Sequence, residues 1–294
     1  MLHTLLYFLA LVCLSTSPNW AKLNHMPVEV LGFWRLLLAA VLMGAWTYFS
    51  KRMSFSTPWR YLRWVVLSGV FFFLHLWTYK YASKNTSVSN TMILFASNPL
   101  WASIGGAFFF HEKITKRLVL SYILALLGIY TLVHHQIEFS QEGVQGDISA
   151  LVSAVFYSAY MLTGKKAREH MNNSFFSFIQ YTVCALCFAG TVLFTQNKIT
   201  GYDQISWIAV VGLVLLPTFL GHFSLTYLVK HMNLTVLSCG KLLEPIFASI
   251  MAYFIFHEQL GAHSWIAFLL TASGVFILFA PGLFKKKLRN ESKL

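Results

Sequence analysis

The sequence predicts an all-α integral membrane protein with ten transmembrane helices arranged as two inverted five-helix repeats. Three observations support this fold class: the composition, the length of the apolar stretches, and an internal repeat. Hydrophobic residues make up 57% of the 294 residues and charged residues only 11%, against about 25% charged residues in an average soluble domain. A chain of this composition is expected to reside in a lipid bilayer.

Apolar stretches of transmembrane length follow one another with short hydrophilic gaps. A bilayer core about 30 Å thick requires about 20 apolar residues per helix. We expect helices because lipid offers no partners for backbone polar groups, and because strands of a barrel would alternate polar and apolar residues. The first apolar stretch lacks the basic start and the small-residue cleavage site of a signal peptide, so we assign it to the first helix. The expected spans are residues 2–22, 27–49, 61–82, 87–110, 117–135, 147–166, 174–195, 204–229, 233–256 and 263–284.

The distribution of lysine and arginine predicts the orientation in the membrane. If the start of the chain is cytoplasmic, sixteen of these residues fall in cytoplasmic connections or in the basic tail 285–294, and four fall on the outer side. The positive-inside rule therefore places both termini in the cytoplasm of a multi-pass protein of the inner (plasma) membrane. The formal charge of +12 then reflects orientation and contact with anionic lipid, and we expect no nucleic-acid partner.

Cysteine and histidine patterns indicate no metal site or cofactor. Cys184 and Cys187 form a C-x-x-C motif inside an apolar span, but no second ligand pair accompanies it, so packing is the simpler interpretation. The motifs that begin at His111 and His257 have Thr115 and Gly261 four residues later, where a zinc protease would have a second histidine.

An internal repeat divides the chain into two halves. A shift of 146 residues aligns Pro99 with Pro245, His111 with His257 and Glu112 with Glu258 without a gap. We therefore expect a first repeat over residues 1–136, a second over 146–284, and a basic tail over 285–294. Because each half contains five spans, an odd number, the second half must enter the membrane from the opposite side. Two equivalent halves of opposite orientation are what a carrier with inward-open and outward-open states requires.

Four segments carry a family resemblance. They are FWRLLLAAVL at 33–42, NPLWASIGGAFFFHEKIT at 98–115, GDISALVSAVFYSAYMLTGKKA at 146–167 and LEPIFASIMAYFIFHEQL at 243–260. In order and spacing they resemble the EamA-type members of the drug/metabolite transporter superfamily. The resemblance implies a ten-helix carrier with a central cavity lined mainly by helices 1, 3, 4, 6, 8 and 9, often used to export amino acids or other metabolites. The usual Gly-Glu at the end of helices four and nine reads His-Glu here.

A lysine and a glutamate one helical turn apart are the principal candidates for substrate binding. Lys241 and Glu244 lie in an apolar span, where an ionised side chain costs about 2.5 to 3.5 kcal/mol, so both should face the bundle interior or water. An i,i+3 ion pair that only neutralises both charges contributes about 0.2 to 0.5 kcal/mol and does not obviously offset this cost. Pro99 and Pro245 follow Asn98 and Glu244 and should kink their helices, which would bring Asn98 close to the charged pair.

Histidine and aromatic residues are expected to complete the site. Histidine is costly in lipid and changes protonation near neutral pH, which favours a role for His75 and His222. Because the chain contains 27 Phe, 13 Tyr and 9 Trp, most aromatic residues must pack or face lipid. The aromatic candidates in the middle of cavity-lining spans are Trp77, Trp101, Tyr157 and Tyr160.

Other charged residues have more structural interpretations. Glu112 and Glu258 lie where one helix stops and the next starts, where a carboxylate would neutralise an amino-terminal helix dipole. Arg35 lies about a third of the way into the second span. It is expected to extend toward the outer interface or to pair across the boundary between the repeats, with a substrate role as an alternative.

Together these features predict a secondary transporter that moves a small metabolite by alternating access. A cation beside an anion suits an amino acid or another zwitterion. A cationic or aromatic metabolite held by Glu244 and aromatic rings is the alternative, and a channel or a membrane enzyme remains a more distant one. A proton could serve as the coupling ion through Glu244 or a cavity histidine. The sequence leaves open the direction of transport and whether the protein is a monomer or a homodimer.

Overall fold

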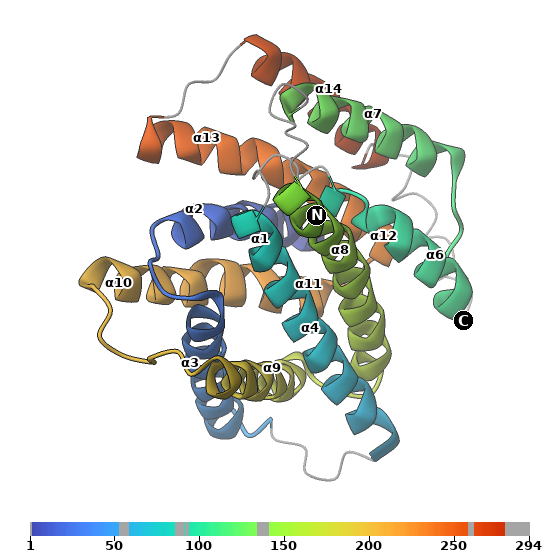
Figure 1. Ribbon diagram of the computed structural model, residues 1–294. Helices are drawn as coiled ribbons and strands as arrows, with labels where there is room; N and C mark the ends of the chain where they lie inside the picture. Colours follow the sequence, from blue (N-terminus) through green and yellow to red (C-terminus); the bar gives the residue numbers. More distant parts are fainter. Residues whose placement is uncertain are drawn as a thin grey trace, which may run out of the picture.

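The computed structural model describes residues 2–52, 59–85, 91, 94–133, 141–257 and 262–279. Within these residues the regular elements are all helical, and Figure 1 shows them packed together as a bundle. Glu258 and the basic tail at 285–294 lie outside the described residues.

The first half of the chain contains six labelled helices and the second half contains the remainder. In the first half these are α1 Leu2–Ser15, α2 Ser17–Lys22, α3 Val28–Phe49, α4 Trp59–Asn85, α6 Asn98–Phe110 and α7 Lys116–Val133. In the second half they are α8 Gln141–Arg168, α9 Asn173–Thr195, α10 Gln204–Leu213, the π-helix η2 Val214–Phe223, α11 Ser224–Leu228, α12 Leu234–Gly240, the 3-10 turn η3 Lys241–Leu243, α13 Glu244–Phe256 and α14 Ala262–Phe279. Helix is present within every expected range.

Six helical segments in the described residues are long and apolar enough to cross a membrane. They are Leu2–Lys22, Val28–Phe49, Arg60–Ser83, Asn173–Thr195, Gln204–Leu228 and Leu234–Ile255. The count of ten spans stays a prediction.

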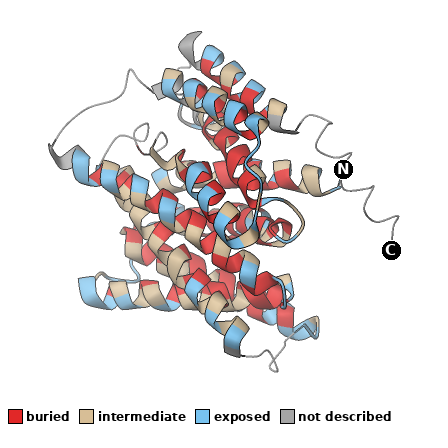
Figure 2. Ribbon diagram, turned by 90° about the vertical axis from the view of Figure 1, so that its right-hand side faces the viewer, coloured by how far each residue is buried: buried red, intermediate tan, exposed pale blue. Residues whose placement is uncertain are grey.

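The outer surface of the bundle is apolar. Phe194 is 90% exposed, Phe49 80% and Phe108 76%, and Figure 2 shows exposed residues on the outside of the bundle with buried residues between the helices. Soluble monomers rarely expose contiguous apolar surface on this scale. These side chains are therefore suited to contact with lipid.

Four expected spans are interrupted within the described residues instead of being continuous helices, including the fourth, which has a turn at residues 96 and 97 before α6 begins with Asn98 and Pro99. The first breaks at Thr16, with Pro18 near the start of α2. The eighth contains a π-helical segment around Pro217. The ninth passes through a 3-10 turn before α13 begins with Glu244 and Pro245. The physical reason is that proline cannot donate its backbone hydrogen bond, so the regular ladder is interrupted where proline lies inside an apolar run.

The internal repeat extends to the bounds of the helices. A shift of 146 residues carries the bounds of α6 onto those of α13, and the bounds of α7 onto those of α14. His111 follows α6 and His257 follows α13, and both residues adopt a left-handed conformation, with φ of 52° and 55°. A left-handed residue is a usual way to end a helix, but in most cases it is a glycine. Two corresponding segments of the sequence thus form the same local structure.

Helices from the two halves pack directly against each other. The closest partners are α3 with α9, α4 with α8, and α7 with α14, while α1 packs against η2 and α6 packs against α8 and α12. The main apolar core contains residues from both halves, including Leu36, Phe72, Tyr157 and Phe188. The fold is therefore held together mainly across the boundary between the repeats.

Arg35 does not extend to the outer interface; of the two expectations for this residue, contact across the boundary between the repeats is the one that the structure shows. Its side chain is only 1% exposed, and its Nε donates a hydrogen bond to Thr218 Oγ1 at 2.8 Å. Thr218 belongs to η2 in the second half, so Arg35 contacts the other repeat.

A pair of glycines allows α7 and α14 to lie side by side, as Figure 1 shows at the top of the view. A Cβ atom on Gly128 would lie 2.6 Å from the carbonyl oxygen of Ala267, and a Cβ atom on Gly274 would lie 2.6 Å from that of Ser121. The shift of 146 residues relates these two contacts to each other. Small residues commonly permit such close approach of membrane helices.

We predict that Gly128→Ala and Gly274→Ala each destabilise the protein by about 1 to 3 kcal/mol, because the added methyl group would overlap backbone atoms of the neighbouring helix. Thermal unfolding of the purified protein in detergent measures this loss. Gly190→Ala is the matched control, because no atom lies within 4 Å of its added Cβ and alanine favours helix over glycine. Equal unfolding temperatures for all three variants would contradict the close packing of α7 against α14.

Candidate functional site

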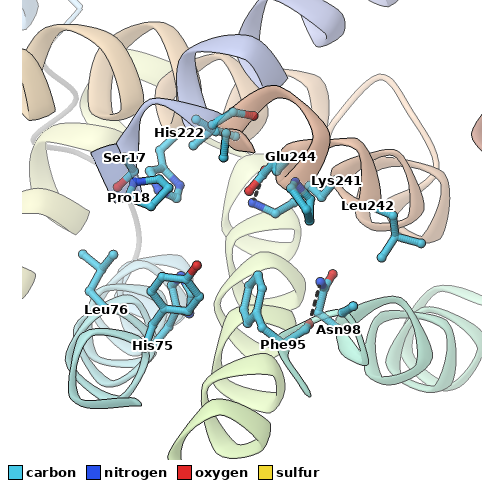
Figure 3. A pocket seen from close by; sticks show the side chains of 16 residues that line it. Ser17, Pro18, His75, Leu76, Phe95, Asn98, His222, Lys241, Leu242 and Glu244 are labelled. Carbon is cyan, nitrogen blue, oxygen red and sulfur yellow. Dashed lines mark hydrogen bonds and ion pairs between the residues drawn. The ribbon is translucent and has the colours of Figure 1, made fainter. Parts of the chain in front are cut away.

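A cavity of about 80 Å³ lies between the two halves of the bundle. This space is sufficient for several water molecules. Figure 3 shows Lys241 and Glu244 lying across the cavity from His75 and Phe95. Its lining residues are Leu14, Ser15, Ser17, Pro18, His75, Leu76, Tyr79, Phe95, Ala96 and Asn98 from the first half, and His222, Lys241, Leu242, Glu244, Pro245 and Ala248 from the second half.

Lys241 and Glu244 form an ion pair in the wall of this cavity. The Nζ atom lies 2.6 Å from Glu244 Oε1, and the side chains are 4% and 21% exposed. Lys241 begins the η3 turn and Glu244 begins α13, so both residues lie where the ninth span is interrupted. The Glu244 side chain is therefore the more exposed of the two.

This buried pair is costly to maintain in an apolar bundle. Removing two charges from water can cost more than their mutual attraction returns, so a buried ion pair is weak evidence for a stabilising role. Ionisable groups inside membrane segments more often mark the path of a substrate or an ion. The position of the pair on the cavity wall favours that interpretation.

Aromatic rings surround the ammonium group of Lys241. Its Nζ lies 4.5 Å from the centroid of the Tyr157 ring and 5.9 Å from that of Phe95. The faces of aromatic rings attract cations at such distances. One wall of the site is thus already suited to a positively charged group.

The two histidines that line the cavity are held by hydroxyl groups from α8. His75 Nδ1 lies 2.9 Å from Ser153 Oγ, and His222 Nδ1 lies 3.2 Å from Tyr160 Oη. The ring of His75 also stacks on Phe95 at 5.4 Å between centroids. Tyr160 therefore lies behind the cavity wall and positions a lining residue.

Asn98 occupies the position in α6 that Glu244 occupies in α13. Its Nδ2 donates to the carbonyl oxygen of Phe95 at 3.0 Å, and its backbone oxygen accepts from Ser158 Oγ at 3.0 Å. Its Oδ1 atom is buried with no hydrogen-bond partner among the described residues. This oxygen remains able to accept a hydrogen bond.

The two tryptophans among the candidates are not part of the cavity lining. Trp77 Nε1 donates to Glu29 Oε1 at 3.4 Å. Trp101 is 37% exposed, and its Nε1 donates to Ser97 Oγ at 3.3 Å. Their proposed role in binding stays a prediction that this arrangement does not support.

Several lining residues were absent from the candidates chosen on the sequence. Tyr79 lies one helical turn after His75, and Phe95 aligns with Lys241 under the 146-residue shift. Ser15, Ser17 and Pro18 reach the cavity because the first span breaks at Thr16. The segment Ser-Thr-Ser-Pro at 15–18 is a recognisable signal for such a break.

A second polar cluster, the Glu112 cluster, joins the two halves away from the cavity. Glu112 Oε1 accepts from Lys165 Nζ at 2.5 Å and from the backbone N–H of Leu234 at 3.1 Å. Glu112 Oε2 accepts from Thr235 Oγ1 at 3.1 Å. The carboxylate thus lies at the amino-terminal end of α12, where the helix dipole favours negative charge. A carboxylate at an amino-terminal helix end is thus found at Glu112, but the expectation that this helix is the next one along the chain is wrong, because it is α12.

The chemistry available at the cavity is ionic and hydrogen-bonding recognition. It offers one carboxylate, one ammonium group, two imidazoles, an amide oxygen and aromatic faces to a small molecule. In the described part of the chain, no group of three or more His, Cys, Asp or Glu side chains is arranged to hold a metal ion.

Comparisons with known proteins place the chain among transporters. The profile of the EamA-like transporter family matches residues 1–134 and again residues 144–280. An uncharacterized transporter of Archaeoglobus fulgidus is 23% identical over 85% of this chain and 87% of its own length. A second from the same organism is 25% identical over 71% of this chain and 73% of its own length.

The fold also matches a solved structure. A protein crystal structure superposes with a TM-score of 0.80, covering 99% of both chains at 17% identity. At this identity the match concerns the fold alone. The family match covers both halves of the chain, and membrane-spanning apolar helices accompany it. The chain belongs to the EamA-like transporter family and is a multi-pass membrane transporter.

Proposed function

We propose that this transporter moves an amino acid or a similar small zwitterion across the inner membrane by alternating access. The observation that carries the proposal is the Lys241–Glu244 ion pair, which is buried in an apolar bundle yet lines a cavity between the two halves. The proposal includes cytoplasmic termini, which the distribution of lysine and arginine supports.

The proposed mechanism includes an inverted repeat of five helices in each half, and three observations support such a repeat. The family profile matches the chain twice, the bounds of α6 and α7 recur in α13 and α14, and Gly128 and Gly274 make reciprocal contacts. An odd number of spans per repeat gives the halves opposite orientations, and rocking of such halves around a central site exchanges its access between the two sides.

A zwitterion can replace the ion pair without leaving a charge unpaired. Its amine would bind Glu244, whose side chain is the more exposed of the two, and its carboxylate would bind Lys241. Asn98 Oδ1, which has no partner among the described residues, can accept a further N–H from the substrate. Because the loaded site is neutral overall, the free-energy cost of holding it inside the membrane stays low.

A cationic or aromatic metabolite is the second candidate. The observation that favours it is the position of an ammonium group, that of Lys241, 4.5 Å from the centroid of the Tyr157 ring. A substrate amine could occupy the same aromatic surface if Lys241 moved away. In that case Glu244 would be the principal counter-ion.

The Glu112 cluster is suited to closing one side of the cavity. It bridges the end of α6 to α8 and to the start of α12, and ten residues of helix, about 15 Å, separate Leu234 from Glu244. The Lys165 and Glu112 side chains are 19% and 8% exposed. Opening this side would require the cluster to separate, because it holds one half against the other.

We predict that Glu244→Gln and Lys241→Met each lower transport into proteoliposomes about ten-fold or more. Each substitution leaves a buried charge without its partner, and losing one partner of such a pair costs about 2 to 5 kcal/mol. Counterflow of a labelled amino acid, chosen by a thermal-shift screen of the wild-type protein, measures the rate.

The matched control is the exposed pair Lys166–Glu169, which has the same i,i+3 spacing at 3.0 Å. Lys166→Met and Glu169→Gln should leave the rate unchanged, because exposed pairs contribute little. Gel filtration verifies that the Glu244→Gln and Lys241→Met variants are folded. If both folded variants keep the wild-type transport rate and substrate affinity, the ion pair does not bind the substrate.

The same variants distinguish the two substrate classes. For a zwitterion, both substitutions should weaken binding, because each removes the counter-ion of one substrate charge. For a monovalent amine, Glu244→Gln should weaken binding strongly, whereas Lys241→Met should preserve or improve it. Competition of unlabelled amino acids and amines against the labelled solute in counterflow measures both affinities.

We predict that Glu244→Gln also removes any stimulation by a proton gradient. Glu244 is the carboxylate of the cavity, and its neighbours in the wall are Lys241, His75 and His222. If protonation of Glu244 couples transport to the gradient, an imposed inside-acidic or inside-alkaline pH should accelerate the wild type and not Glu244→Gln. A gradient effect of equal size in both proteins would assign coupling to another group.

We predict that Glu112→Gln exposes α12 to solvent by weakening the cap and the pair with Lys165. Cys239, on α12, is 1% exposed and serves as a native reporter. Its modification by a maleimide, followed by mass spectrometry, should accelerate several-fold in Glu112→Gln and not in the control Glu169→Gln. No acceleration would show that the Glu112 cluster does not control access on this side.

A further inference from the structure

Arg35 is a buried cation whose hydrogen-bonding capacity is mostly unused. The side chain is 1% exposed, and Nε donates to Thr218 Oγ1 at 2.8 Å. Among the residues that the structure describes, neither Nη1 nor Nη2 has a hydrogen-bond partner. Because a guanidinium has five N–H groups, four of its donors are left without an acceptor.

Three other buried or half-buried cations among the described residues reach oxygen atoms. Lys241 pairs with Glu244 and Lys165 with Glu112, while Arg168 donates to the backbone carbonyl oxygens of Thr226 and Met171. Arginine stays protonated in proteins, so Arg35 cannot relieve its charge by losing a proton. A buried cation in this state is stabilised by an anion, and none of the described residues is shown to supply one to Nη1 or Nη2.

The π-helix η2 positions Arg35 and does not neutralise it. The Thr218 hydroxyl donates its own hydrogen to the carbonyl oxygen of Leu213 at 2.8 Å, so its oxygen is free to accept from Arg35. Tyr181 Oη donates to the Thr218 carbonyl oxygen at 3.3 Å. The bond from Nε fixes one edge of the guanidinium, and Nη1 and Nη2 have no hydrogen-bond acceptor among the described residues.

The Arg35 position is also close to the wall of the cavity. Thr218 and His222 are four residues apart on η2, which is about one helical turn. His222 lines the cavity and contacts Tyr160. Wide π-helical turns occur frequently at functional sites.

We propose that Nη1 and Nη2 of Arg35 form a binding site for a small monovalent anion, either a halide or a carboxylate. The parallel N–H groups of the fork match the two oxygens of a carboxylate, and they can also converge on one halide ion. A carboxylate could be that of the transported solute, a source that rests on the proposed function, whereas a halide would be a resident ion independent of it. In both cases the anion removes the unpaired charge between α3 and η2.

Thermal unfolding of the purified protein tests this site without a transport assay. Titrations with sodium chloride or sodium acetate are made at constant ionic strength, with the bulky sulfonate isethionate as the replacement anion. The unfolding temperature of the wild type should rise by a few degrees and then saturate with at least one anion, because a ligand that binds only the folded state stabilises it. Saturation with chloride alone assigns a resident halide, and saturation with acetate alone assigns a carboxylate.

Three variants locate the response. Arg35→Gln should abolish it, and Arg35→Lys, which keeps the charge but loses the fork, should raise the half-saturating concentration. The matched control Arg168→Gln removes a buried arginine that already has carbonyl partners, so it should keep the response of the wild type. If Arg35→Gln does not fold, the half-saturating concentration of Arg35→Lys decides whether the anion binds at Arg35.

The proposal is overturned if the wild type shows no saturating response to either anion. It is equally overturned if Arg35→Lys responds with the half-saturating concentration of the wild type. Because the titration measures equilibrium binding, these results do not depend on whether Lys241 and Glu244 bind the transported solute. Failure of the anion site and failure of the transport proposal are therefore distinguishable.

Discussion

The cost of charge inside an apolar bundle is the constraint on which the structure depends. Many large apolar side chains are exposed on the outside of the bundle, among them Phe194 at 90%. In such a bundle a buried charge is costly unless it is paired or takes part in binding. Lys241 and Glu244 meet this demand by pairing at 2.6 Å on a cavity wall. The pair is balanced only while both charges are present, and a zwitterion is a ligand that can separate it and restore the balance.

Interruptions in the helices make this arrangement feasible. The η3 turn before Pro245 and the break at Thr16 both face the cavity, and non-helical backbone within a membrane bundle is tolerated where it lines such a space. The π-helix η2 presents His222 to the cavity and Thr218 to Arg35. The polar groups of the bundle are thus gathered where the regular hydrogen-bond ladder is already broken.

Much of the fold and part of the site were predictable from the sequence, for identifiable reasons. Long apolar runs predicted where helix would occur. The 146-residue repeat aligned His111 with His257, and both residues end their helices in the same left-handed conformation. Charged and imidazole side chains were good guides to the cavity because lipid tolerates them poorly. Trp77 and Trp101 were poor guides, because tryptophan is equally at home in packing and at the membrane interface. Contact of Arg35 with the second half was one of two expectations, but its partner Thr218 was not predictable, because it is 183 positions away in sequence.

The central claim is that the two halves are inserted in opposite orientations around a shared polar site. His111 and His257 occupy equivalent exposed positions at the ends of α6 and α13, so His111→Cys and His257→Cys provide the most direct measurement. In intact cells, a membrane-impermeant maleimide should modify the cysteine at position 257 and spare the one at 111 until the membrane is permeabilised. Modification of both positions from the same side would contradict the inverted repeat and the alternating-access mechanism that depends on it.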